Sequence, residues 1–173
     1  PDDMVAILAS GQADIIGAAR PSIADPFLPK KIEEGRLEDI RECIGCNVCV
    51  SRWERGSALV CSQNATANEE FRRGWHPEIF TPAPQPSGVL IVGAGPAGLE
   101  CARILGLRGY DVHLCEAEGE IGGHMRDVMR YPGYSEWGRV ISYRQSQIQK
   151  LKNVEIHTDT RLDAIDVLNY GAE

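Results

Sequence analysis

A glycine-rich loop at residues 93–98 is the feature that most constrains the fold of this chain. The loop reads Gly-Ala-Gly-Pro-Ala-Gly and lies between an apolar run at residues 88–92 and an apolar helical pattern at residues 97–107. A second apolar run follows at residues 111–115. Strand, helix and strand in this order predict a β-α-β unit of about 30 residues. We therefore expect an α/β protein that includes part of a Rossmann-like nucleotide-binding domain.

Each glycine of the loop has a distinct expected role in binding a nucleotide. Gly93 permits a tight turn, Gly95 lets the backbone approach a pyrophosphate, and Gly98 lets the helix pack closely on the strand. Pro96 suits the first helical turn, where its missing N–H costs nothing. Ala97 lies in the same turn, where the helix N-terminus offers backbone amides and partial positive charge to a phosphate.

Further candidate contacts to the nucleotide follow the second strand. Glu116 lies 18 residues after Gly98, where a carboxylate can accept hydrogen bonds from ribose hydroxyls and would repel a 2'-phosphate. Gly122 and Gly123 are a second close approach, and His124 either contacts the nucleotide or is a surface histidine. The expected ligand is ADP or an ADP-containing nucleotide such as FAD. The alternative is a glycine turn that serves packing alone.

Four of the six cysteines fall within nineteen positions, where helical and strand periodicity is absent. Cys43, Cys46 and Cys49 are spaced by two residues, and Cys61 follows after eleven more. Three thiolates in this spacing with a distant fourth are typical of a [4Fe-4S] cluster. The alternatives are structural zinc, whose ligands more often form two separated pairs, and disulfides or unrelated thiols.

The other two cysteines and a glycosylation motif receive simpler interpretations. Cys101 and Cys115 are expected to be small buried side chains and not ligands. The triplet Asn64-Ala65-Thr66 matches a glycosylation acceptor. We interpret it as accidental, because a low-potential cluster would be oxidised in a secretory compartment.

The remaining patterns divide the chain into segments. These are residues 1–40, 41–80, 81–87 and 88–173. We expect 41–80 to be a cluster-binding segment, 81–87 a proline-rich linker and 88–173 the nucleotide-binding domain, truncated at its C-terminus. The family resemblance described below implies that residues 1–40 are the last part of a barrel. The expected elements outside the β-α-β unit are helices at 2–10, 24–35, 135–151 and 163–169, and strands at 13–19 and 154–158.

Composition excludes several classes of protein. The 173 residues carry a formal net charge of −7, which offers no basic face to nucleic acid. No apolar run approaches the ~20 residues that cross a bilayer, so no membrane segment is expected. The chain starts at Pro1 without a leader-like segment, and we interpret it as an internal piece of a larger polypeptide.

The residues around the cysteines resemble those of the trimethylamine dehydrogenase family, which includes dimethylamine, histamine and dimethylglycine-type dehydrogenases. The resemblance covers essentially the whole chain. Three stretches carry it: Cys43-Ile44-Gly45-Cys46-Asn47-Val48-Cys49-Val50-Ser51-Arg52-Trp53-Glu54, Cys61-Ser62-Gln63-Asn64-Ala65-Thr66 and Arg72-Arg73-Gly74-Trp75-His76-Pro77. The continuation after Cys49 is more specific than the cysteine spacing. Residues 17–26 are similar to the last strand and loop of the family's FMN-binding (β/α)8 barrel.

The resemblance implies a cytoplasmic FMN/[4Fe-4S] amine dehydrogenase that passes electrons through its cluster to an electron-transfer flavoprotein. Arg20 would hold the FMN phosphate, and Trp53 would form part of an aromatic wall around the amine. A homodimer is expected. The spacing before Cys61 is one residue shorter than in trimethylamine dehydrogenase, and Glu42 and Arg139 also depart from it. The alternatives are an NADPH-dependent relative of 2,4-dienoyl-CoA reductase with FAD, and an electron carrier or nucleotide-binding module without a substrate.

Overall fold

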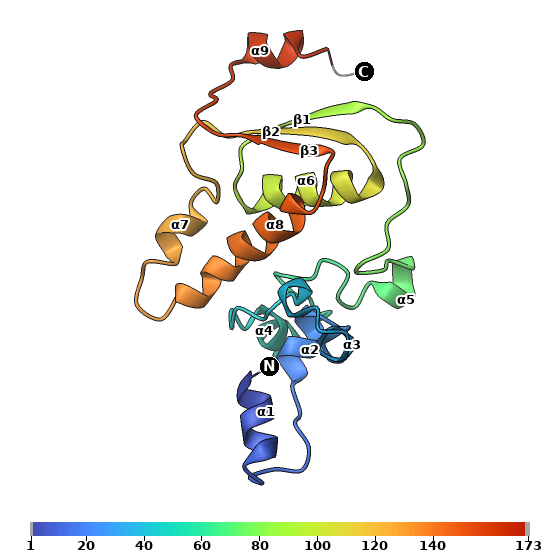
Figure 1. Cartoon of the computed structure of the whole chain (residues 1–173), viewed down its shortest axis with the longest axis vertical. Coiled ribbons are helices and arrows are strands. Elements are labelled where there is room, and N and C mark those ends of the chain that lie inside the picture. Colours follow the sequence, from blue (N-terminus) through green and yellow to red (C-terminus); the bar gives the residue numbers. More distant parts are fainter. Residues whose placement is uncertain (1, 172–173) are drawn as a thin grey trace. The chain divides into compact units, whose positions relative to one another are not determined.

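The computed structural model describes residues 2–171, which divide into two compact units, residues 2–77 and 78–171. The second unit contains a parallel sheet in the order β1-β2-β3 (Figure 1). Its strands are β1 (Gly88–Val92), β2 (Asp111–Cys115) and β3 (Val154–His157). The predicted α/β class and β-α-β unit are therefore confirmed within a small parallel sheet, and β3 ends one residue earlier than predicted.

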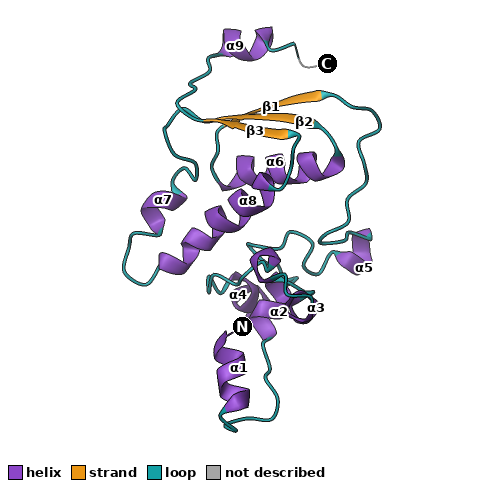
Figure 2. Cartoon of the chain, in the orientation of Figure 1, coloured by secondary structure: helices purple, strands orange, loops and turns teal. Residues whose placement is uncertain are grey.

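Helices cover the two faces of this sheet unequally. The long helices α6 (Pro96–Arg108) and α8 (Arg139–Gln149) lie on one side, and the short α9 (Ala164–Asn169) lies on the other (Figure 2). The helix predicted over 135–151 is interrupted, because Ser135–Gly138 forms a 3-10 turn before α8. The short α7 (Met125–Val128) precedes that turn.

The core of the second unit lies between the sheet and its two long helices. Alternate residues of β2, Val112 and Leu114, are fully buried there. They belong to one apolar cluster with Leu99 and Ala102 of α6 and Ile148 of α8. The period of two along the strand and the period of 3.6 along the helices are the patterns that predicted these elements.

The first unit has short helices, and its interior combines apolar and polar side chains. Its elements are α1 (Asp2–Ala9), α2 (Ala19–Ala24), α3 (Leu28–Glu33), a 3-10 turn (Leu37–Asp39), α4 (Val48–Glu54) and α5 (Glu70–Arg73). Lys31 Nζ donates to Asp25 Oδ2 at 2.7 Å, and both side chains are 2% exposed. The backbone amide of Arg41 donates to the same Asp25 oxygen at 2.8 Å. One buried ion pair thus joins three segments of this unit.

Three local predictions were wrong. The strand expected at 13–19 is loop up to Ala18, and Ile15 is 85% exposed. A buried strand needs a neighbour that accepts its backbone hydrogen bonds, and the sheet described within residues 2–171 holds only β1, β2 and β3. The helix expected at 24–35 is shortened to α3, since Asp25 leaves the helical conformation. Cys101 is exposed on α6, whereas Cys115 is buried as expected.

Candidate functional site

The glycine loop turns tightly between β1 and the first turn of α6. Gly93 has φ 96°, in the left-handed region that favours glycine, and its amide donates to the Cys115 carbonyl at 2.7 Å. Gly95 is the extended N-cap residue of α6, and Pro96 follows at the first helical position. Ala97 is exposed in that turn. The loop therefore presents the start of a thirteen-residue helix at the carboxyl edge of the sheet.

Two glycines of this loop differ in what their missing side chains would meet. A Cβ on Gly98 would lie 1.9 Å from the Gly93 carbonyl oxygen, so the packing of helix on loop requires glycine there. A Cβ on Gly95 would meet nothing within 4 Å, and the φ of Gly95 is −71°, which any residue adopts. Gly95 is therefore not required by the protein's own packing. Open space at this point leaves room for a ligand such as a pyrophosphate.

Glu116 is buried behind the loop and fixes its shape. Its Oε2 accepts the Ala94 amide at 2.8 Å, and its Oε1 accepts the Glu118 amide at 3.0 Å. These and other backbone amides lower the pKa of the Glu116 carboxyl, against the opposing effect of burial, and the Arg126 charge lowers it further. The Glu116 carboxylate, which is expected to accept hydrogen bonds from a ribose, therefore also binds the backbone of the glycine loop. Sequence reasoning missed this second contact, because it depends on the turn after β2.

The second glycine pair meets the first loop. Gly122 donates to the Ala94 carbonyl at 2.7 Å, and a Cβ on Gly123 would lie 3.2 Å from the Gly95 Cα. Gly123 therefore lies close against the loop, as a second approach to a nucleotide requires. The His124 side chain is 86% exposed, and its Nδ1 is 3.8 Å from an Asp127 carboxylate oxygen. Its position suits a surface histidine at the mouth of the loop.

The four clustered cysteines lie in one segment of the first unit. The backbone amides of Gly45 and Gln63 donate to the sulfurs of Cys43 and Cys61, each at 3.4 Å. The Cys46 sulfur is 3.1 Å from the hydroxyl of Ser62. All six cysteines of the chain lie within the described residues and are thiols there, not disulfides.

The separation of these sulfurs differs from that in a one-ion zinc site. Burial raises the pKa of the Cys61 thiol, backbone amides lower it, and the neighbouring Cys46 and Cys43 raise it again. Within residues 2–171, no three of the four sulfurs lie within 4.8 Å of one another. A tetrahedral zinc ion with 2.3 Å bonds needs separations of about 3.8 Å. An iron–sulfur cluster bound there would place positive charge beside Cys61, Cys46 and Cys43.

Arg20 and Trp53 are both linked to the cysteine segment. Arg20 Nη1 donates to the side-chain oxygen of Asn47, which has a left-handed φ of 58° between Cys46 and Cys49. Sequence reasoning missed this link; the only available signal was a polar residue between two cysteines. Trp53 is 70% exposed on α4, and it follows Cys49 by four residues. Residues at this spacing are neighbours on one helix, so the exposed Trp53 indole lies next to Cys49.

The Asn64 amide is a structural group. Its Nδ2 donates to the Ile23 carbonyl at 3.0 Å, and its Oδ1 accepts from both the amide and the hydroxyl of Thr66. Asn64 is 2% exposed, which agrees with the interpretation of its glycosylation motif as accidental. No helix in the described part of the chain has the length and apolar character to cross a membrane.

Comparison with known proteins finds relatives among the oxidoreductases. A family model described as a NAD(P)-binding Rossmann-like domain matches residues 91–151. Dimethylamine dehydrogenase from Hyphomicrobium sp. (strain x) is 56% identical over 99% of this chain and 24% of that protein. Histamine dehydrogenase from Rhizobium sp. 4-9 superposes with a TM-score of 0.97 at 56% identity, over 100% of this chain and 25% of that one. A 2-naphthoyl-CoA reductase superposes with a TM-score of 0.90 at 35% identity, over 99% and 26%. The chain thus spans about a quarter of the length of these relatives.

Proposed function

Because the chain belongs to the trimethylamine dehydrogenase-like family of oxidoreductases, we propose that it carries the electron-relay and nucleotide-binding parts of an FMN/[4Fe-4S] amine dehydrogenase. The single observation that carries the proposal is the cysteine segment, where backbone amides are aimed at Cys43 and Cys61 while Cys46 lies beside Ser62. The complete enzyme would oxidise a C–H bond next to an amine nitrogen and deliver the electrons to an electron-transfer flavoprotein.

In this proposal the cysteine segment holds the cluster in a defined electrostatic environment. When bound, FMN takes up the two electrons of the amine C–H bond, and a [4Fe-4S] cluster passes electrons on one at a time. Amide donors to the ligating sulfurs are one of the protein's means of setting the cluster potential. Arg20, whose guanidinium carries five N–H donors, would use the groups not directed at Asn47 to hold the FMN phosphate.

Trp53 would contact the substrate amine in the complete enzyme. An indole face attracts a cationic amine by about 0.5 to 2 kcal/mol, and it accepts N-methyl groups that an ion pair would exclude. Its neighbour on α4, Cys49, would be a ligand of the relay. The same short helix would then position one substrate contact and one cluster ligand, and α4 would join the two halves of the reaction.

The glycine loop would bind an ADP-containing nucleotide. Open space at Gly95, the start of α6 and the facing Gly123 together suit a pyrophosphate, and Glu116 is placed behind them. In the amine branch of the family we expect ADP itself at this loop. Free FAD would instead favour the reductase alternative, in which electrons enter from NADPH.

The reductase alternative has a specific observation in its favour, the 35% identity to 2-naphthoyl-CoA reductase. Higher identity to the amine dehydrogenases favours the amine branch. The two residues between Cys46 and Cys49 favour it as well, since three are usual in the reductases that resemble 2,4-dienoyl-CoA reductase. Heating the complete protein and chromatographing the released nucleotide distinguishes the two alternatives, since the amine branch should release ADP and the reductase FAD.

Replacing one cluster cysteine tests the relay directly. In the complete enzyme, Cys46→Ala should lower bound iron and abolish electron transfer to a one-electron acceptor, while amine still bleaches the flavin absorbance. The matched control is Cys101→Ala, because Cys101 is an exposed cysteine on α6 in the other unit. It should keep both iron and turnover. Normal turnover of Cys46→Ala with the one-electron acceptor would contradict the relay.

A further inference from the structure

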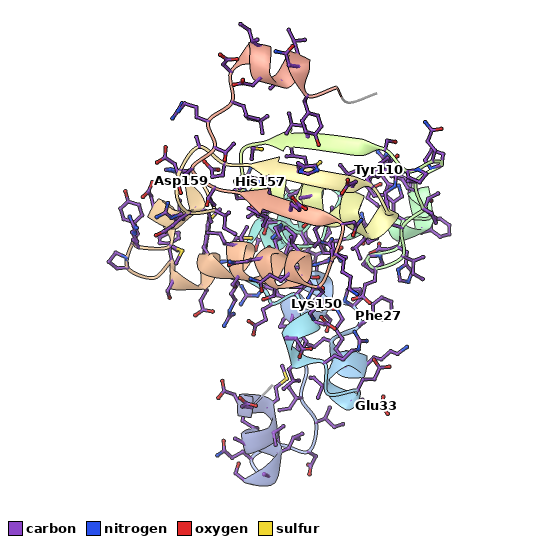
Figure 3. All side chains as sticks on the ribbon, turned by 45° about the horizontal axis from the view of Figure 1, so that its top comes forward. Phe27, Glu33, Tyr110, Lys150, His157 and Asp159 are labelled. Carbon is purple, nitrogen blue, oxygen red and sulfur yellow. The ribbon has the colours of Figure 1, made fainter. Side chains whose placement is uncertain are left out.

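Three metal-binding side chains converge on the sheet face opposite α6 and α8. His113 of β2 lies in register with Glu155 of β3, and His157 follows two residues later on the same face (Figure 3). His113 Nδ1 is 3.2 Å from His157 Nε2. One Glu155 oxygen, Oε2, lies 3.8 Å from the first nitrogen and 3.5 Å from the second. Among residues 2–171, this is the one set of three such donors within 4.8 Å of one another.

The separations of these atoms match the size of a transition-metal ion. A point equidistant from three atoms with these separations lies about 2.0 Å from each, which is the usual bond length of zinc to imidazole nitrogen and carboxylate oxygen. Two imidazoles and one carboxylate form a ligand set that zinc accepts with a fourth position open to water. The set contains only nitrogen and oxygen donors, because the thiol of Cys115 is not part of it.

The residues around His113 favour a bound cation, and they favour the His113 tautomer whose Nδ1 carries no proton. The second ring nitrogen of His113, Nε2, is 4.0 Å from Asp111 Oδ2. A carboxylate on this side favours a proton on Nε2. The lone pair of Nδ1 is then directed toward His157, on the side of the proposed ion, as is usual for histidine ligands. Glu155 and Asp111 add two negative charges around two imidazoles. The Tyr170 ring packs edge-on against His113, with ring centroids 5.8 Å apart, and limits its rotation.

We propose that His113, Glu155 and His157 bind one divalent transition-metal ion of the zinc class, which links strands β2 and β3. None of these three residues belongs to the cysteine segment or to the glycine loop. Its ligands come from two neighbouring strands, and their side chains are 30% to 63% exposed, so an ion reaches them from solvent. In the metal-free protein, one imidazole donates its N–H to the other across the 3.2 Å contact. Binding moves that proton to the outer nitrogen of the same ring, and the two nearly parallel rings turn so that both lone pairs reach the ion.

The test uses the complete protein after removal of loosely bound metal with a chelator, with iron counted before and after to show that the iron is retained. Zn²⁺ is then titrated against a chromophoric competitor. Wild type should bind one more Zn²⁺ per chain than the double variant His113→Gln/His157→Gln, and each single variant should bind at least about tenfold more weakly. Asp111→Asn should weaken binding about 10- to 100-fold, as outer-shell changes do.

A matched control and a second measurement make the outcome decisive. His124→Gln removes another exposed histidine that lies 3.8 Å from a carboxylate but belongs to no set of three metal-binding donors among residues 2–171, so Zn²⁺ binding should not change. X-ray absorption at the zinc edge of the wild-type protein needs no variant and should show two imidazoles in the first shell. Equal zinc binding by wild type and the double variant, or a first shell without imidazole, would overturn the proposal.

Discussion

Two of the three glycines of the loop, Gly95 and Gly98, are chemically identical but should respond oppositely to alanine. At Gly98 the added Cβ would lie 1.9 Å from the Gly93 carbonyl oxygen and 3.1 Å from its carbon. Both atoms are backbone, so the clash is relieved only by shifting α6 away from the loop. Overpacking of this kind costs about 1–3 kcal/mol, and a backbone neighbour places it at the upper end.

At Gly95 the protein alone accepts alanine. The backbone is in an ordinary extended conformation and the Cβ would enter open space. Such a substitution changes stability little, or stabilises by about 0.4–1 kcal/mol, because it restricts the unfolded chain. The added methyl group would, however, occupy the space proposed for the pyrophosphate. Gly95→Ala should therefore lower bound nucleotide at least tenfold while leaving the unfolding temperature equal to or above that of wild type.

The assay measures both quantities on the same preparations. Nucleotide is released by heat and quantified per chain by chromatography, and thermal unfolding is followed by circular dichroism. Gly119→Ala is the control, because its Cβ would meet only the flexible Asp159 side chain, at 3.3 Å. Full nucleotide content in Gly95→Ala would refute the role of this glycine in ligand approach. Wild-type stability in Gly98→Ala would refute the packing argument.

Three further predictions concern buried polar groups. Lys31→Met should destabilise the protein by about 3–5 kcal/mol, because Asp25 is left charged and buried, whereas Lys30→Met at an exposed position should be nearly neutral in a denaturant titration. The pKa of Glu116 is lowered by folding, so its ionised form stabilises the protein above the unfolded pKa and loses that effect as pH falls through the folded pKa. The stability difference between wild type and Glu116→Gln should therefore be larger at pH 7 than at pH 3, and a constant difference would contradict the assignment. Asn64→Ala should cost about 1–3 kcal/mol by leaving the Ile23 carbonyl without its donor, again measured by denaturation.

The second unit was predictable because its signals are local. The apolar strand, the glycine turn and the apolar helix are contiguous, and each follows its own period. Expected and observed bounds of β1 and β2 coincide. The segment at 13–19 failed for the opposite reason. Its apolar residues resemble a strand, but a strand exists only where a neighbour pairs with it, and pairing is a long-range property that a local pattern does not contain.

The candidate site was predictable in residue type but not in contacts. Spacing alone identified Cys43, Cys46, Cys49 and Cys61, whereas their amide and hydroxyl partners depend on left-handed turns that short sequences do not specify uniquely. Likewise, the position of Glu116 after β2 was evident, but its contact with Ala94 spans 22 residues. The histidine pair of β2 and β3 was missed because its members are 44 residues apart and become neighbours only through the strand register.

The two units differ in what holds them together, and this difference bears on the cluster. The second unit buries an apolar cluster between sheet and helices. The first unit buries polar side chains together with apolar ones, and the polar ones are Asp25, Lys31, Arg41, Gln63, Asn64 and Thr66. Polar contacts add little net stability unless every partner is in place, so such a unit gains most from a centre that joins its segments. A cluster held by Cys43, Cys46, Cys49 and Cys61 would bind the folded form only, and by mass action its binding energy would become folding energy for this unit.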